Sequence, residues 1–267
     1  MLDAFGLYGR FLATALRKEL QYRASFLLAC IGQFAVTAVE FAGPYALFAR
    51  FARLGVWSLP EVALFYGVVN VIFSFADAFG RGFDLLPRQL QSGGFDRTLV
   101  RPRSTFLQVL GQEFALFRVG RLAQGMTIFA WAALELELRW TPGTCALLLL
   151  TLVGGTCLFV GLFVLQATLA FWTTETLELM NTLTYGGVEA AQYPLALYGV
   201  WFRRFFTFVV PLAAIAYFPV LALLERPDPL GSPYWFQCSA PLLGVAFLFV
   251  SAQLWKLGVR HYTSTGS

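Results

Sequence analysis

The sequence is poor in charged residues. Only 13% of its 267 residues are Asp, Glu, Lys or Arg, whereas 58% are hydrophobic and the mean hydropathy is +0.67. A soluble domain carries about 25% charged residues, so this chain has too little polar surface to cover a globule in water. The shortage excludes an ordinary soluble domain and indicates a protein whose solvent is the lipid bilayer.

Lysine and histidine are almost absent. Neither of the two lysines, Lys18 and Lys256, belongs to a G-x-x-x-x-G-K-[ST] motif, so the sequence has no loop of the kind that cradles nucleotide phosphates. The single histidine, His261, excludes His-rich metal sites and a Ser-His-Asp triad. We therefore expect no catalytic, cofactor-binding or metal site on this chain.

Long apolar runs take the place of the missing charge. Six of them reach or approach the ~20 residues that a helix needs to cross about 30 Å of hydrocarbon. They cover residues 24–48, 56–79, 106–133, 145–172, 205–224 and 238–255. We predict an all-α polytopic membrane protein with six transmembrane helices, which together form one transmembrane domain over residues 24–256.

Lysine and arginine are distributed unevenly between the connecting segments. If the N-terminus is cytoplasmic, thirteen of them fall in inner segments and four in outer segments. Basic residues favour the cytoplasmic side, so we predict that both termini are cytoplasmic and that residues 257–267 form a cytoplasmic tail. The net charge of +4 then reflects topology, and we expect no nucleic-acid partner.

The first segment, residues 1–23, is amphipathic. Its apolar residues, among them Tyr8, Leu12 and Leu16, recur at helical spacing, while Arg10 and Arg17 mark another face. This pattern predicts a helix that lies along the inner leaflet. The alternative is a cytoplasmic extension of the first span.

Residues 81–105 form the first predicted cytoplasmic loop. Phe83 and Leu86 have helical spacing, a Gly-Gly pair then breaks the helix, and Asp96, Arg97 and Arg101 form a charged turn. We predict a short helix parallel to the membrane, followed by a turn that docks a cytosolic partner. The alternative is that these arginines only set topology and touch anionic lipid.

Residues 173–204 form the second predicted cytoplasmic loop, in which a short helix is expected to stop at Tyr185-Gly186-Gly187. The chain beyond that point carries Pro194, Pro211 and Pro219 within apolar sequence. Prolines at this density predict broken or kinked helices, which membrane proteins tolerate where neighbours satisfy the freed carbonyls.

Five of the charged residues inside the predicted spans are candidates for a site. Arg121 and Glu40 have similar depths in the third and first spans, so they could form an interhelical pair. Asp77 and Glu113 lie nearer the inner face, and Arg118 lies between Glu113 and Arg121 in depth. Charge in hydrocarbon is costly and is usually paired or functional. We predict a structural ion-pair network, and the alternative is a direct role in substrate passage.

Two stretches resemble a known family. The segment "GGFDRTLVRP" before the third span resembles the cytoplasmic motif of the ABC-2 type permeases, in the branch of six-span proteins of about 260 residues. The segment "YPLALYGVWFRRFFTFVVPLAAIAYFPVLALL" is similar to a second signature of that branch.

The resemblance implies the transmembrane subunit of an ATP-driven exporter in a bacterial-type cytoplasmic membrane. A separate ATPase subunit, in two copies, would bind ATP and Mg²⁺. A second permease subunit would complete a homodimer or heterodimer surrounded by membrane lipids. Phe83, Leu86, Asp96, Arg97 and Arg101 would then couple the permease to the ATPase.

Two other classes of function stay open on the sequence alone. An ion-coupled secondary transporter could use Glu40, Glu113 or Asp77 as a proton carrier, but such folds usually contain internal repeats, and the two halves of this sequence show no convincing repeat. A membrane scaffold is the other alternative. The composition suits drug, lipid, glycan and peptide substrates alike.

Overall fold

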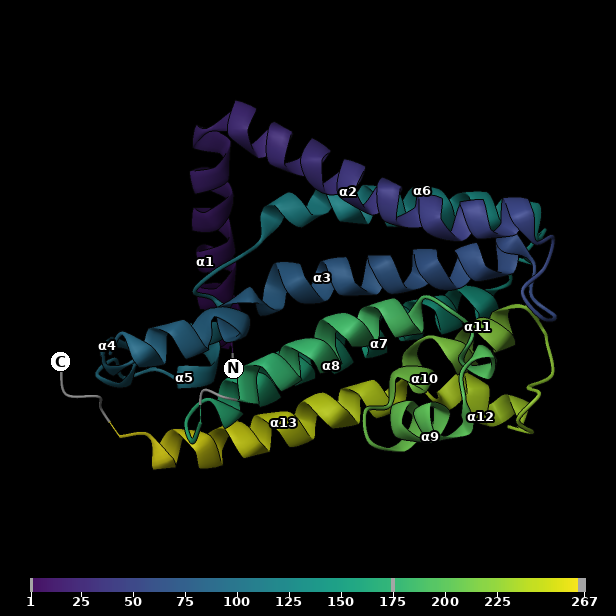
Figure 1. The fold of residues 1–267 in the computed structure, drawn as a ribbon. Coiled ribbons are helices and arrows are strands. Elements are labelled where there is room, and N and C mark those ends of the chain that lie inside the picture. Colours follow the sequence, from purple (N-terminus) through teal and green to yellow (C-terminus); the bar gives the residue numbers. More distant parts are fainter. Residues whose placement is uncertain (1, 174–175, 264–267) are drawn as a thin grey trace.

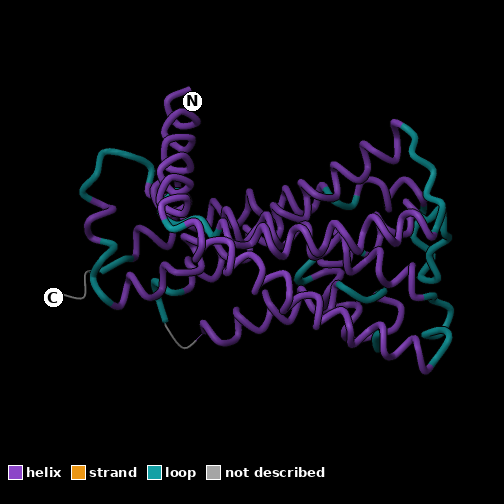
Figure 2. The backbone as a smooth tube through the Cα atoms, turned by 90° about the horizontal axis from the view of Figure 1, so that it is seen from above, coloured by secondary structure: helices purple, strands orange, loops and turns teal. Residues whose placement is uncertain are grey.

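The chain folds as an elongated bundle of helices (Figures 1 and 2). The computed structural model describes residues 2–173 and 176–263, and within these ranges all regular elements are helical. The elements are α1 (Leu2–Gln21), α2 (Arg23–Arg50), α3 (Leu59–Gln91), α4 (Asp96–Leu99), α5 (Thr105–Leu110), η1 (Leu116–Arg118), α6 (Val119–Glu135), α7 (Pro142–Leu169), α8 (Thr176–Ala191), η2 (Leu195–Leu197), α9 (Val200–Phe208), α10 (Leu212–Ile215), α11 (Tyr217–Leu223), α12 (Tyr234–Ser239) and α13 (Leu242–His261). The predicted all-α polytopic membrane fold is confirmed.

Not all of the six predicted spans are single continuous helices. In the described part of the chain, α2, α3, α7 and α13 are long and apolar enough to cross a membrane. A fifth crossing can be made by the bent pair Val200–Phe208 and Leu212–Leu223, whose two parts meet at 73°. The predicted fifth span therefore contains the kink that its prolines indicated.

The predicted third span, residues 106–133, is not one helix. It consists of α5, a break, η1 and α6, and α6 has 17 residues. The backbone inside the break is partly satisfied by a neighbour, because the Ala115 N–H donates to the Ala78 carbonyl oxygen of α3 at 3.2 Å. Irregular backbone at membrane depth is tolerated where protein groups supply such hydrogen bonds.

Helices α3 and α7 form the centre of the bundle. Helix α13 packs along α7, while α6 packs along the other side of α3 and carries α2 on its outside (Figure 1). Helices α7 and α13 approach very closely: a Cβ added at Gly244 would overlap the Gly154 carbonyl oxygen. Small residues of this kind let transmembrane helices pack backbone to backbone. Helix α2 is the least buried span, with only Thr37, Pro44 and Phe48 buried.

Helix α1 lies across one end of the long helices (Figure 1). It is separated from α2 at Tyr22, so it is a distinct helix and not a continuous extension of the first span. The Tyr8 ring packs against Phe114 with ring centroids 5.4 Å apart. Helix α1 and the C-terminal end of α13 lie toward the same end of the bundle (Figures 1 and 2).

The segment around Phe83 differs from its prediction. It is not a separate helix parallel to the membrane, because α3 continues through it to Gln91. Phe83 and Leu86 are fully buried, and the Phe83 ring lies 4.9 Å from Phe106 and 5.2 Å from Trp255, measured between ring centroids. This face of α3 is covered by α5 and α13, so its apolar residues serve the core of the chain itself.

The segment 173–204 also differs from a peripheral loop. Helix α8 continues through the Gly186-Gly187 pair to Ala191 and packs along α3 and α7. The Tyr185 ring lies 5.6 Å from the Phe73 ring and 6.5 Å from the Phe163 ring, so α8 enters the bundle beside two spans. Residues 174 and 175, which precede this helix, lie outside the described residues.

The opposite end of the bundle is closed by a short loop after α11. Arg226 in this loop forms an ion pair with Glu61 in the first turn of α3, and its guanidinium lies 4.3 Å from the centre of the Trp57 ring. Asp228 accepts a hydrogen bond from the Tyr217 hydroxyl at 2.8 Å. These contacts tie the bent fifth crossing to the start of α3.

Candidate functional site

A stripe of polar residues runs along one face of α3. Successive members are three or four residues apart, which places them on one side of a helix. They are Tyr66, Asn70, Ser74, Asp77, Arg81 and Asp84. The first four are buried in an otherwise apolar helix. Buried polar groups in a membrane-spanning helix are costly and commonly mark functional regions.

Asp77 is the centre of the stripe. Its side chain is fully buried, and its Oδ2 atom lies 2.6 Å from Nε of Arg118, while Oδ1 lies 3.5 Å from Nη1 of Arg81. Arg118 also donates from Nη1 to Oε1 of Gln33 on α2 at 2.8 Å. One carboxylate thus joins α2, α3 and η1. The break before η1 is what brings Arg118 to this position.

Arg121 has a different partner from the one expected. Its Nε donates to Oδ1 of Asn70 at 2.7 Å, and its guanidinium lies 4.9 Å from the centre of the Phe73 ring. Glu40 is exposed on α2 and forms no ion pair with Arg121 in the described structure, although the two interact electrostatically. The predicted ion pair between Arg121 and Glu40 is therefore absent, because Arg121 instead donates a hydrogen bond to the side-chain amide of Asn70 on α3.

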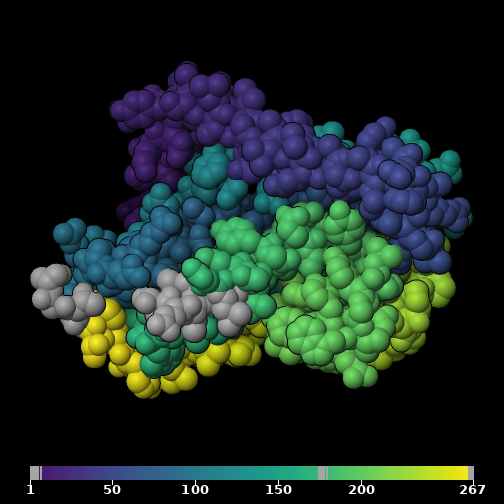
Figure 3. All heavy atoms as spheres, in the orientation of Figure 1, coloured from purple at the N-terminus to yellow at the C-terminus, as the bar shows by residue number. Residues whose placement is uncertain are grey.

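A second carboxylate, that of Glu189, acts on Arg121 from α8. Glu40 and Glu189 are both exposed, and they interact electrostatically with each other as well. In the space-filling view, α2 and the segment from α8 to α10 form adjoining ridges on one face (Figure 3). Glu189 was missed from sequence because it was placed in a cytoplasmic loop. Its signal was that it is the only charged residue between Glu178 and Arg203.

The inner end of the stripe is Asp84. It forms an ion pair with Arg81 at 2.8 Å and accepts hydrogen bonds from Nε2 of Gln166 at 3.4 Å and from the Tyr185 hydroxyl at 3.5 Å. Gln166 in turn donates to Oδ1 of Asn181 at 3.1 Å. These groups come from α3, α7 and α8 and line a polar hollow of about 280 Å³.

Glu113 takes no part in this network. It is exposed in the break between α5 and η1, and it forms no ion pair with any residue that the structure describes. Of the five predicted intramembrane charges, the structure brings Asp77 and Arg118 into contact. Arg121, on α6, contacts Asn70 and Phe73, which lie one to two turns from Asp77 along α3.

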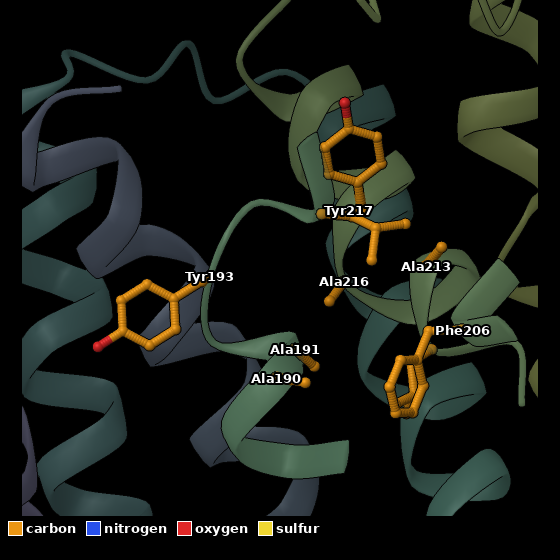
Figure 4. Close-up of a pocket in the computed structure, with 9 residues that line it drawn as sticks. Ala190, Ala191, Tyr193, Phe206, Ala213, Ala216 and Tyr217 are labelled. Carbon is orange, nitrogen blue, oxygen red and sulfur yellow. The ribbon is translucent and has the colours of Figure 1, made fainter. Parts of the chain in front are cut away.

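The bent segment encloses only a small apolar cavity of about 10 Å³. The alanines that line it, among them Ala190, Ala191, Ala213 and Ala216, lie near the rings of Phe206 and Tyr217 (Figure 4). A cavity of this size holds about one water molecule, which excludes it as a substrate site in this conformation. The alanines allow α8, α9 and α10 to pack closely at the bend.

The turn after α3 is folded and carries charge on its outside. Phe95 is fully buried and packs against Phe171, with ring centroids 5.4 Å apart. Asp96 accepts a hydrogen bond from the Tyr262 hydroxyl at 2.9 Å, which ties the turn to the C-terminal end of α13. Arg97 and Arg101 are exposed. Two apolar residues at the tip, Leu99 and Val100, are exposed as well, by 41% and 83%.

Comparison with protein families decides between the open classes. The sequence model of the family described as ABC-2 family transporter protein matches residues 34–266, which is most of the chain. The chain belongs to the ABC-2 transporter family. It is a multi-pass membrane permease, the transmembrane component of an ABC transporter and not itself an ATPase, and permeases of this family work with ATPase subunits. No curated protein and no solved structure matches the chain.

Proposed function

We propose that this permease is the transmembrane subunit of an ATP-driven exporter in a bacterial-type cytoplasmic membrane. Two copies of a separate ATPase would bind ATP and Mg²⁺, and a second permease subunit, identical or related, would complete the pathway. The observation that carries the proposal is the continuity of α3. One helix bears the buried polar stripe and leads directly into the exposed charged turn.

The coupling surface is assigned to the turn and not to the end of α3. Phe83 and Leu86 are buried in this chain and support the turn from inside. Leu99 and Val100 are exposed and take over the role of apolar anchors, since buried apolar anchors dominate the energy of protein interfaces. Arg97 and Arg101 supply charge at the rim, where it mainly orients the partner.

The substrate pathway is assigned to the face that carries Glu40 and Glu189. Both carboxylates are exposed beside the buried Arg121, and α2 presents a largely exposed apolar surface next to them. A single chain with a close-packed centre leaves little room for passage, so the pathway would lie between two permease subunits. Closed two-fold assemblies are the commonest arrangement for such subunits.

The exporter function is tested by reconstituting the permease with and without its ATPase. We expect ATP hydrolysis and transport only when both are present, because this sequence lacks a phosphate-binding loop. ATP hydrolysis by the permease alone would contradict the proposal. Transport driven by an ion gradient without any ATPase would favour the secondary transporter instead.

A further inference from the structure

A groove lies between α5 and α13. It has a volume of about 540 Å³ and lies where the start of α5 meets the last turns of α13 (Figure 1). The contact between the two helices includes a hydrogen bond from the Trp255 indole N–H to the Thr105 hydroxyl oxygen at 3.3 Å. The groove is separate from the polar stripe on α3.

The mouth of the groove is positively charged. Lys256 and Arg260 line it one turn apart on α13, and no acidic residue is among the described residues that line it. The Lys256 ammonium donates to Oε1 of Gln253 at 2.9 Å, which leaves two of its three donors for a ligand. Because Thr105 accepts from Trp255, its own hydroxyl hydrogen is also available. Ser104 adds a second hydroxyl at the rim.

The inner wall of the groove is apolar. It is formed by Phe106, Ala252 and Val259, together with the ring of Trp255. The groove therefore presents exposed cationic groups and hydroxyls beside a more buried apolar wall. This division matches the two parts of a phospholipid, a phosphate-bearing headgroup and an acyl chain.

The position of the groove along α13 fits the same ligand. The predicted sixth span ends at Trp255, and tryptophan is enriched at membrane–water interfaces. Lys256 and Arg260 follow directly, at the level where basic side chains meet anionic headgroups of the cytoplasmic leaflet. A free phosphate would use the charged mouth alone and leave the apolar wall without a role.

We propose that this groove binds an anionic phospholipid of the cytoplasmic leaflet. The phosphate contacts Lys256, Arg260 and the hydroxyls of Ser104 and Thr105, and the first part of an acyl chain lies against Phe106 and Ala252. Because the groove joins α13 to the start of α5, the bound lipid holds the broken third segment against the bundle. The inference does not depend on the direction of transport.

The test measures lipid retained by the full-length permease. The protein is reconstituted in nanodiscs of phosphatidylcholine and phosphatidylglycerol. It is then released from the nanodiscs in the mass spectrometer under mild activation, and the lipids that stay bound are identified by native mass spectrometry. We expect about one tightly held phosphatidylglycerol per chain. The variant Lys256→Gln/Arg260→Gln should retain it about fivefold less for each charge removed. The matched control Arg97→Gln/Arg101→Gln removes the same charge at the same end, outside the groove, and should retain it fully.

A second variant separates a lipid from a free anion. Ala252→Leu fills the apolar wall without changing charge, and it should also lower phosphatidylglycerol retention, whereas inorganic phosphate should not displace the lipid from the unchanged protein. Size-exclusion profiles and thermal stability report whether each variant is folded. Should Lys256→Gln/Arg260→Gln unfold, Ala252→Leu and the phosphate competition still decide the proposal.

Three results would overturn the proposal. If Lys256→Gln/Arg260→Gln and Arg97→Gln/Arg101→Gln lose the same amount of lipid, the lipid is held by general attraction to basic residues and not by the groove. Displacement of the lipid by inorganic phosphate would indicate a simple anion site. Unchanged lipid retention in Lys256→Gln/Arg260→Gln, with weaker retention of the ATPase subunit, would make the groove a protein-docking surface.

Discussion

Among single residues, Asp77 connects several elements of the bundle. Its buried carboxylate contacts two guanidinium groups, from Arg118 and Arg81, and through Arg118 it reaches Gln33 on α2. A buried ion pair contributes little net stability when complete, but the loss of one partner leaves an uncompensated charge. Single and double substitutions at this site should therefore behave very differently.

Asp77→Asn should lower the stability of the permease by about 3–5 kcal/mol, because Arg118 then remains buried without a carboxylate. The additional change Arg118→Gln should restore much of the loss. Thermal unfolding monitored by fluorescence-detected size exclusion gives the measurement, with Glu113→Gln at the exposed break as the control. If Asp77→Asn is as stable as Glu113→Gln, the ion pairs at Asp77 do not hold the bundle.

Arg121 allows a test of which partner matters. Its hydrogen bond to Asn70 predicts an interaction energy of about 1.5–3 kcal/mol, as is usual for hydrogen bonds to charged groups, in a double-mutant cycle of Arg121→Gln and Asn70→Ala. The cycle of Arg121→Gln with Glu40→Gln should show a smaller coupling, since those two side chains interact only at a distance and form no direct contact. Coupling to Glu40 that exceeds coupling to Asn70 would contradict the observed geometry.

At the scale of elements, α3 ends close to α5. A Cβ added at Gly82 would overlap the Val109 carbonyl oxygen of α5. Gly82→Ala should therefore push α5 away and destabilise the fold by about 1–3 kcal/mol. Gly43→Ala in α2 is the matched control, because the space around Gly43 is open and alanine favours helix. Comparable melting temperatures for the two variants would show that α5 does not rest on α3.

The exposed turn provides a test of coupling. Val100→Ser should weaken association with the ATPase and lower coupled ATP hydrolysis, while the yield of folded permease stays unchanged, because Val100 touches little of its own chain. Phe83→Ala should instead lower the folded yield, since it opens a cavity in the core. The idea fails if Val100→Ser keeps full coupled hydrolysis, or if Phe83→Ala affects only coupling.

The sequence predicts the elements well where an apolar run coincides with one unbroken helix. The predicted ranges 24–48 and 145–172 lie within three residues of the ends of α2 and α7, and the range 238–255 covers most of α13. The range 106–133 is wrong as a single helix, because average hydropathy is insensitive to a backbone break. The second span was predicted to end at residue 79, whereas α3 continues to Gln91, and an ion pair between Arg81 and Asp84 lies in this continuation.

The candidate site was predicted less completely than the fold. Charge in apolar sequence identified Asp77, Arg118 and Arg121, but not which groups they contact. Neutral partners such as Asn70 and Gln166 carry no charge signal, and their roles depend on which helices are neighbours. Whether two charged residues form an ion pair depends on the direction of their side chains. The predicted depth of Glu40 matches that of Arg121, yet Glu40 is exposed on α2.

At the scale of the whole molecule, the orientation in the membrane can be tested with two thiols. Cys145 is exposed at the end of the bundle that is predicted to face outward, so an impermeant maleimide should label it in intact cells. Val100→Cys in a Cys145→Ser background should be labelled only after the membrane is permeabilised, because the turn is predicted to be cytoplasmic. Labelling of Val100→Cys in intact cells would reverse the topology.

The length of α3 gives the molecule a mechanical property. Its 33 residues form a rod of about 50 Å, anchored by Arg226 at one end and by the exposed turn at the other. If the rod pivots about Arg226 by about 10°, the far end sweeps about 9 Å at that length. Asp77, near the middle, would move about half as far. A modest push by a partner on the turn would thus become a graded displacement at every depth of the membrane.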